Sequence, residues 1–193
     1  MHKPWLWMSL LLPGLLWADD AEIRRAIEEG TQAYEAGEWS RAAAQLDYAA
    51  TLVRQLQAGQ LGELFPEPLP GWQADEANTQ AGGAALFGGG IHASRHYRKD
   101  NARLEMTITK NSPLLQTMAM LFTNPSMATM SGYKIRRIHE QTAMVKEEGN
   151  SKELMMLVAN TTLVQLSGSG SELTMDELEA YAGALDVAAL SAL

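Results

Sequence analysis

The stretch Leu64-Phe-Pro-Glu-Pro-Leu-Pro-Gly-Trp72 divides the chain into two parts of different character. Its three prolines stand at alternate positions, and each proline disfavours helical backbone in the residue before it. We therefore expect residues 62–72 to form an extended, Pro-rich linker. An N-terminal helical part precedes this linker, and a C-terminal part rich in strands follows it.

The segment before the linker has the composition of helices. From Asp19 to about Gln60 it is rich in Ala, Glu, Gln and Arg and contains no proline. Apolar residues recur at helical spacing on both sides of Gly37. The pattern predicts two amphipathic helices joined by a tight turn, a helical hairpin over residues 19–61.

The turn of this hairpin resembles a tetratricopeptide repeat, in which small residues let two helices approach closely and an aromatic residue follows the turn. The residues that carry the resemblance are Gly30, Gly37, Trp39, Ala42 and Ala49. No second copy follows, and a single repeat cannot bury its own face. The hairpin is therefore expected either to dock on its own domain or to bind a partner, with Tyr34 and Trp39 as the candidate partner-binding residues.

After the linker the apolar period shifts towards two, which is typical of strands. Strands are expected over residues 84–87, 91–98, 102–110, 133–139, 142–147, 152–159 and 162–167. Ser112-Pro113 is expected to open a helix between the third and fourth strands, with Ser112 as its N-cap. Thr174 and Glu177 form a capping box that opens a C-terminal helix. Residues 73–193 are thus predicted to be an α+β domain, an antiparallel β-sheet sandwich with flanking helices.

Two features of this domain carry a further resemblance. One is a glycine-started strand that leads into the strand containing Gln141-Thr-Ala-Met-Val145, and the other is the final strand that runs into Ser167-Gly-Ser-Gly170 and an acidic helix. Together they look like small exported or lumenal proteins of the PsbP-like type. They also resemble uncharacterised proteobacterial exported proteins that join such a domain to a single helical repeat. The resemblance implies a scaffold or assembly role and supplies no catalytic residues.

Residues 1–18 have the three parts of a secretory signal peptide. Lys3 provides the positive region, Trp5 to Leu16 the apolar region, and Ala18 a small residue before the expected cleavage at Asp19. The apolar run is too short to span a bilayer. We therefore expect a periplasmic protein that is not stably inserted in the membrane after cleavage.

Composition narrows the classes of function. The chain has no cysteine, which excludes disulfides, thiolate catalysis and a lipid anchor on an N-terminal cysteine. Its net charge of −8 argues against nucleic acid as a partner. The sequence offers no grouping of nucleophile, base and orienting residue, so an enzyme is not expected.

No cofactor or metal is expected either. His92 and His96 share a strand face but lie about 13 Å apart, too far to share one metal ion, and His139 is remote in sequence. Eleven methionines are many, but they are spread along the chain as core filler would be. A methionine-lined groove and copper(I) binding are the alternatives for these side chains.

Charge is segregated along the chain, and basic residues gather in two strand regions. If the two regions were neighbours, they would form a basic patch able to receive an acidic partner or an anionic ligand. The alternative is a solvated outer sheet face. The candidate residues are Arg95, Arg98, Lys99, Arg103, Lys134, Arg136 and Arg137.

The leading hypothesis is a non-catalytic periplasmic interaction or scaffold protein that binds a protein partner or self-associates. The first alternative is a carrier of a small ligand, a lipid or a peptide, with a methionine-lined pocket. The second is an enzyme with an unrecognised site.

Overall fold

The computed structural model describes residues 15–79 and 90–193, and the strand expected over residues 84–87 lies outside them. The described chain divides into two compact units, one ending at Val53 and one beginning at Arg54. Helices α1 (Leu15–Glu35) and α2 (Trp39–Gly62) are followed by strands and shorter helices. The predicted α+β class, a helical N-terminus followed by an antiparallel sheet with flanking helices, is confirmed.

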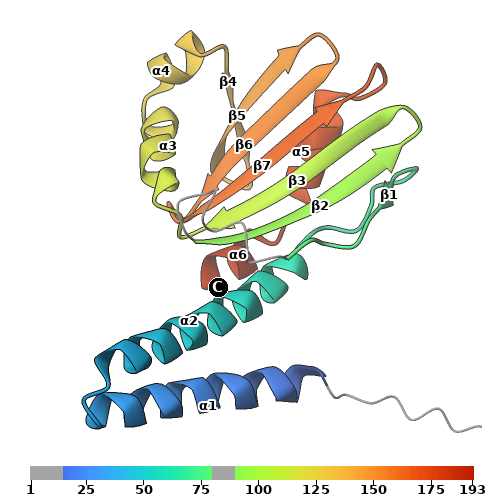
Figure 1. Cartoon of the computed structure of the whole chain (residues 1–193). Coiled ribbons are helices and arrows are strands. Elements are labelled where there is room, and N and C mark those ends of the chain that lie inside the picture. Colours follow the sequence, from blue (N-terminus) through green and yellow to red (C-terminus); the bar gives the residue numbers. More distant parts are fainter. Residues whose placement is uncertain (1–14, 80–89) are drawn as a thin grey trace, which may run out of the picture. The chain divides into compact units, whose positions relative to one another are not determined.

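The first unit is the predicted hairpin (Figure 1). α1 begins at Leu15 and therefore runs through the expected cleavage junction between Ala18 and Asp19. The turn is closed by Gly37, whose φ of +77° favours glycine. The helices approach closely at Gly30, where an added Cβ would lie 3.0 Å from a Leu46 methyl group. The buried hydrophobic residues of this unit are Ile23, Ala26, Ala33, Ala42 and Ala49.

The second unit is built on one seven-stranded antiparallel sheet. Its strands are β1 (Gln73–Ala74), β2 (Ile91–Lys99), β3 (Ala102–Lys110), β4 (Lys134–Ile138), β5 (Gln141–Glu148), β6 (Ser151–Val158) and β7 (Thr162–Ser169). They lie in the order β1-β2-β3-β7-β6-β5-β4 (Figure 1). The two expected sets of strands therefore form one sheet, because β3 pairs with β7 from Arg103↔Ser169 to Lys110↔Thr162.

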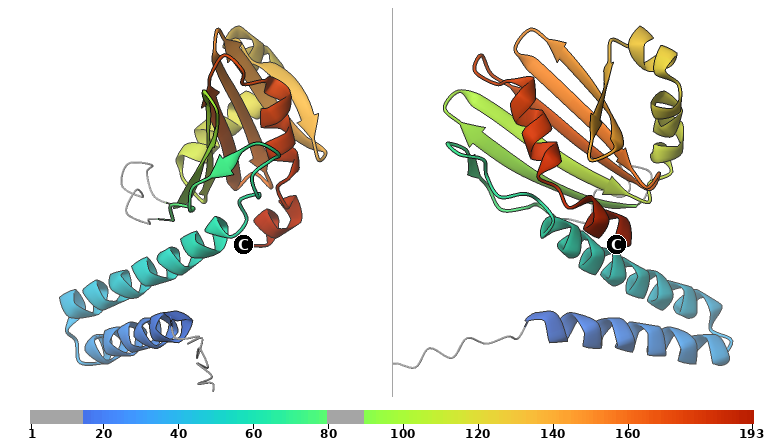
Figure 2. Two further views of the ribbon diagram at one scale, coloured as in Figure 1. Left: turned by 90° about the vertical axis from the view of Figure 1, so that its right-hand side faces the viewer. Right: turned by 180° about the vertical axis from the view of Figure 1, so that it is seen from behind.

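Each face of the sheet packs against different helices (Figure 2). On one face α5 (Met175–Gly183) and α6 (Val187–Ala192) join the larger core, in which Tyr97, Met156 and Tyr181 are fully or almost fully buried. On the other face α3 (Leu114–Thr123) and α4 (Pro125–Met130) cover a smaller cluster around Met144 and Met155. The second face is therefore covered over only part of its width.

Of the two helix starts predicted from the sequence, that of α5 has the expected cap and that of α3 does not. Thr174 and Glu177 form the expected capping box at the start of α5. Ser112 is not the side-chain cap of α3, because Pro113 takes the N-cap position in helical backbone. The Ser112 carbonyl instead accepts a hydrogen bond from the Leu115 amide, so the helix starts with a tight turn around the proline.

Residues 62–72 are an integral part of the second unit. Phe65 and Trp72 are buried in the larger core, and the Tyr97 hydroxyl donates a hydrogen bond of 2.9 Å to the Pro66 carbonyl. The Leu69 amide donates to the Tyr181 hydroxyl. The segment was expected to be extended throughout, but turns close both of its ends: the Leu64 amide donates to the Leu61 carbonyl, and the Trp72 amide donates to the Leu69 carbonyl across Pro70 and Gly71. It packs on the sheet unit. The expected hairpin over 19–61 likewise divides, since Ala58 and Leu61 of α2 belong to the same core.

Among residues 15–79 and 90–193, no helix combines the length and apolar character that crossing a membrane requires.

Gly170, directly after β7, provides a test of the packing between β3 and β7. Its φ is +144°, and an added Cβ would lie 2.7 Å from Ala102 Cα and 2.9 Å from the Asn101 carbonyl. Because backbone atoms must shift, we expect Gly170→Ala to lower the free energy of unfolding by more than about 2 kcal/mol. The measurement is urea denaturation.

Gly149 provides the matched control. It also has a positive φ, +58°, but nothing lies within 4 Å of an added Cβ. Gly149→Ala should cost only about 1 kcal/mol. Equal losses in the two variants would show that the close approach at Gly170 does not matter.

Candidate functional site

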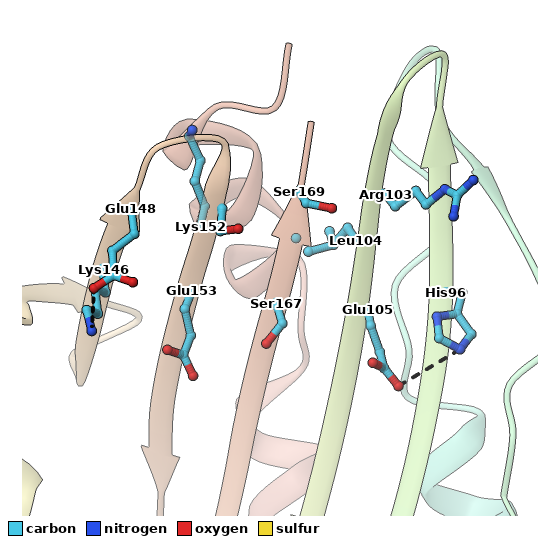
Figure 3. Close-up of a pocket in the computed structure, with 12 residues that line it drawn as sticks. His96, Arg103, Leu104, Glu105, Lys146, Glu148, Lys152, Glu153, Ser167 and Ser169 are labelled. Carbon is cyan, nitrogen blue, oxygen red and sulfur yellow. Dashed lines mark ion pairs between the residues drawn. The ribbon is translucent and has the colours of Figure 1, made fainter. Parts of the chain in front are cut away.

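The uncovered part of the second sheet face carries a polar groove of about 530 Å³ (Figure 3). The register places its side chains in two rows that cross five strands, β2, β3, β7, β6 and β5. The inner row is His96, Glu105, Ser167, Glu153 and Lys146. The outer row is Arg103, Ser169, Ser151 and Glu148, and Arg98 on β2 continues this row outside the groove. The next row towards α3 contains Met155 and Met144, and there the smaller core begins.

The groove is hollow because its central positions are small. Ser167 and Ser169 lie on β7 in the middle of the sheet, and Ser151 lies beside them on β6. Long charged side chains stand on the strands at either side (Figure 3). Side chains of a strand alternate between faces, so the polar residues of this face come from every second position.

The wall on β5 and β6 is held by contacts of its side chains with one another and with Tyr133 and Gln165 beside the groove. The two carboxylate oxygens of Glu153 accept hydrogen bonds from the Tyr133 hydroxyl, at 2.9 Å, and from the Gln165 amide, at 3.0 Å. Burial, and then the bond to Glu153, raises the pKa of Tyr133 to about 12, so its hydroxyl remains a donor at neutral pH. Lys146 pairs with Glu148 at 2.8 Å. The carboxylate of Glu153 is thus fixed in place at the edge of the groove.

The side chains of the wall on β2 and β3 make fewer contacts with other side chains. Glu105 Oε1 lies 3.9 Å from His96 Nε2, and both side chains are about half exposed. In the described part of the chain, no hydrogen bond or ion pair involves the Arg103 side chain, which extends over β2 in Figure 3. This wall therefore presents one carboxylate and one guanidinium to a ligand.

The structure does not bring the seven predicted basic residues together. β4, which carries Lys134, Arg136 and Arg137, lies at one edge of the sheet, and β7, β6 and β5 separate it from β3. The single basic patch that was considered for these residues is therefore not formed. The hypothesis required the two basic strand regions to be neighbours in the sheet, and the order of strands in a sheet cannot be deduced from their order in the sequence.

Most of the predicted basic residues contact other parts of the same unit. Arg98 pairs with Asp75 at 2.6 Å, Lys99 with Glu177 at 2.9 Å, and Arg136 with Glu179 at 3.5 Å. Arg95 donates to the Asp75 and Pro66 carbonyls, and Arg137 donates to the Glu140 carbonyl. These contacts tie neighbouring segments and α5 to the sheet. Of the seven, only Arg103 lines the groove.

The predicted hairpin residues Tyr34 and Trp39 are exposed, with 61% and 64% of their surface accessible. Their rings meet edge to face, with centroids 5.3 Å apart. Trp39 thus follows the turn, as in a tetratricopeptide repeat, and packs against Tyr34, but its side chain is not enclosed between the helices.

The histidines lie at separate places. His92 contacts the Thr109 hydroxyl, and burial lowers its pKa, with a smaller opposing effect from Glu105. His139 contacts the Gly183 carbonyl. Within residues 15–79 and 90–193, no three His, Asp or Glu side chains gather to form a metal site.

Met144, Met155 and Met156 are buried and Met118 packs against the smaller core, which agrees with the interpretation of methionines as core filler. Met120, Met127 and Met130 are exposed on α3 and α4. The groove contains no methionine. The methionines therefore do not form the pocket that the carrier alternative required at this site.

The groove residues Glu105, Glu153, Ser167 and Ser169 were not predicted as a site. Each strand's polar alternation was visible in the sequence, and it does assign these residues to one face. The pairing of β3 with β7 was not visible, and only that pairing puts Glu105 and Ser167 in one row.

Comparisons with known proteins provide no family. No family model matches the chain, and no curated protein matches it. Among solved structures, the chain resembles a protein from Thermotoga maritima described as a GTP binding regulator, with a TM-score of 0.41 and 5% sequence identity. The match covers 66% of this chain and 85% of that one. At this TM-score the two folds differ too much for that protein's function to bear on this chain.

The contact between Lys99 and Glu177 predicts a pH dependence of stability. Burial raises the Glu177 pKa, but hydrogen bonds from Lys99, Thr174 and Trp72 outweigh it, so the pKa is lowered from 4.5. A lowered folded-state pKa means that the carboxylate stabilises the fold above the unfolded-state value and loses this effect as pH falls through the folded-state value.

We therefore expect Glu177→Gln to cost about 1 kcal/mol of unfolding free energy at neutral pH, a modest value for a partly exposed site. The difference from wild type should shrink below about pH 4.5. Urea denaturation at several pH values measures it, with exposed Glu76→Gln as the control. A difference that stays constant through the acid range would contradict the assignment.

Proposed function

We propose that this protein is a non-catalytic interaction protein that acts in the periplasm after export, and that its helical hairpin docks a protein partner or a second copy of itself. The observation that carries the proposal is the exposed pair of Tyr34 and Trp39 at the hairpin turn. Tyr and Trp are enriched among the residues that contribute most to binding energy at protein interfaces.

The composition of the hairpin supports this role. Its buried hydrophobic residues are four alanines and Ile23, while six of its larger apolar side chains are more than a third exposed. Exposed apolar surface rimmed by charged residues is typical of protein interaction sites. The exposed apolar residues of this unit are Ile27, Tyr34, Trp39, Leu46, Tyr48 and Val53.

The aromatic pair is also well ordered for binding. The two rings hold each other edge to face, which reduces the conformational entropy that docking would cost. Arg41 pairs with Glu38 at 3.0 Å beside Trp39 and supplies a polar rim. An apolar anchor with a charged border is the usual anatomy of such an interface.

The resemblances to a tetratricopeptide repeat and to PsbP-like proteins favour the same role, because both imply scaffold or assembly functions. The carrier alternative in its methionine-lined form has less support, since the described groove is lined by charged and hydroxyl side chains. The enzyme alternative lacks an assembled set of nucleophile, base and orienting residue at this groove.

Trp39→Ala tests the proposal. We expect the variant to weaken the complex roughly thirtyfold, the effect of losing a central aromatic anchor. Sedimentation velocity over a wide concentration range measures self-association, and crosslinking in the producing cells followed by mass spectrometry identifies a partner.

Met130→Ala is the matched control, because Met130 is 89% exposed but lies on α4 of the other unit. It should leave the complex unchanged. A strict monomer that recovers no partner even after crosslinking would overturn the proposal, and so would equal effects of the two variants.

A further inference from the structure

We propose that the groove on the open sheet face binds a small zwitterion of dipeptide size, with a free ammonium at one end and a free carboxylate at the other. This site is separate from the docking role of the hairpin and does not depend on it. The inference rests on the charges of the groove walls, on their spacing and on the size of the cavity.

The inner row provides the ammonium subsite. Glu105 on β3 and Glu153 on β6 stand on either side of Ser167 on β7 (Figure 3). Adjacent strands are about 4.8 Å apart, so the two backbone positions are separated by about 10 Å. An ammonium group above Ser167 lies within reach of both carboxylates and of the serine hydroxyl. Its three donors match these three acceptors.

The outer row provides the carboxylate subsite. Arg103 lies two residues before Glu105 on β3, on the same face of the sheet. Its exposed side chain can turn towards Ser169 without losing a hydrogen bond or ion pair to any described residue. A guanidinium binds a carboxylate through two parallel hydrogen bonds, and the Ser169 hydroxyl adds a further donor next to it.

The spacing of the two subsites selects the length of the ligand. Residues two apart on a strand are about 6.7 Å apart. An extended dipeptide spans a similar length between its two ends. A dipeptide laid along β3 and β7 therefore places its ammonium in the inner row and its carboxylate in the outer row.

The other charges of the groove disfavour ligands of a single sign. A simple anion would face Glu105, Glu148 and Glu153, while a simple cation would face Arg103, Lys146 and Lys152, of which Lys152 lies 3.9 Å from Glu147. Lys146 and Glu148 already pair with each other, which leaves Arg103 and Glu105 as the least engaged charges. The volume of about 530 Å³ lies within the range of small-molecule sites.

Four probes test the assignment on the unmodified protein: alanyl-alanine, its N-acetyl form, its C-terminal amide and alanine. NMR titration of the backbone amides of Ser151, Gly168 and Ser169 reports on the groove. We expect alanyl-alanine to shift these signals in a saturable way. Each blocked form, lacking one charge, and the shorter alanine should bind at least about tenfold more weakly.

Two variants assign the subsites. Arg103→Gln should abolish the preference for a free carboxylate and keep that for a free ammonium, and Glu105→Gln should do the reverse. Arg137→Gln, the same replacement at the far edge of the sheet, should bind as wild type does. Groove signals that stay unchanged with every probe would overturn the proposal. Equal binding of the blocked and free dipeptides, or variants that behave like Arg137→Gln, would also overturn it.

Discussion

The antiparallel pairing of β3 with β7 is the interaction on which the rest of the second unit depends. It joins the β2–β3 hairpin to the meander of β4 to β7 and so makes one sheet from two sets of strands. Without it the larger core would not close, because residues from both sets, such as Ile108 and Val164, lie in that cluster. The alignment of the two groove rows follows from the same register.

The two faces of the sheet differ because different helices cover them. α5 is held by Tyr181, which contacts Tyr97 and Trp72, and by the pair of Lys99 with Glu177. The same tyrosine accepts a hydrogen bond from Leu69, so the proline-rich segment and the helix are fastened at one point. α3 and α4 cover only the methionine cluster on the opposite face. The polar groove is the part of that face which no helix covers.

Local features were predictable because they depend on neighbouring residues. The five strands β2 and β4 to β7 fall within one or two residues of their expected bounds, β3 matches its expected bounds, and the capping box opens α5. Features that depend on distant pairing were not predictable. Trp72 was predicted to be linker and lies in the core. Lys99 and Arg136 were considered for one patch, but four strands separate β2 from β4. The groove was missed for the same reason.

The basic residues show how strand order changes the meaning of a charge pattern. In sequence, the seven form two runs that could recognise an anionic partner. In the fold, Arg95, Arg98 and Lys99 reach residues 66–75 and α5, and Arg136 reaches α5 from the other edge. Most of the seven basic side chains therefore bind other segments of the same unit and hold it together. Of the seven, Arg103 alone remains on a groove wall, where it lies two residues from Glu105 on the same face of β3. A guanidinium next to a carboxylate suits a ligand that carries both charges.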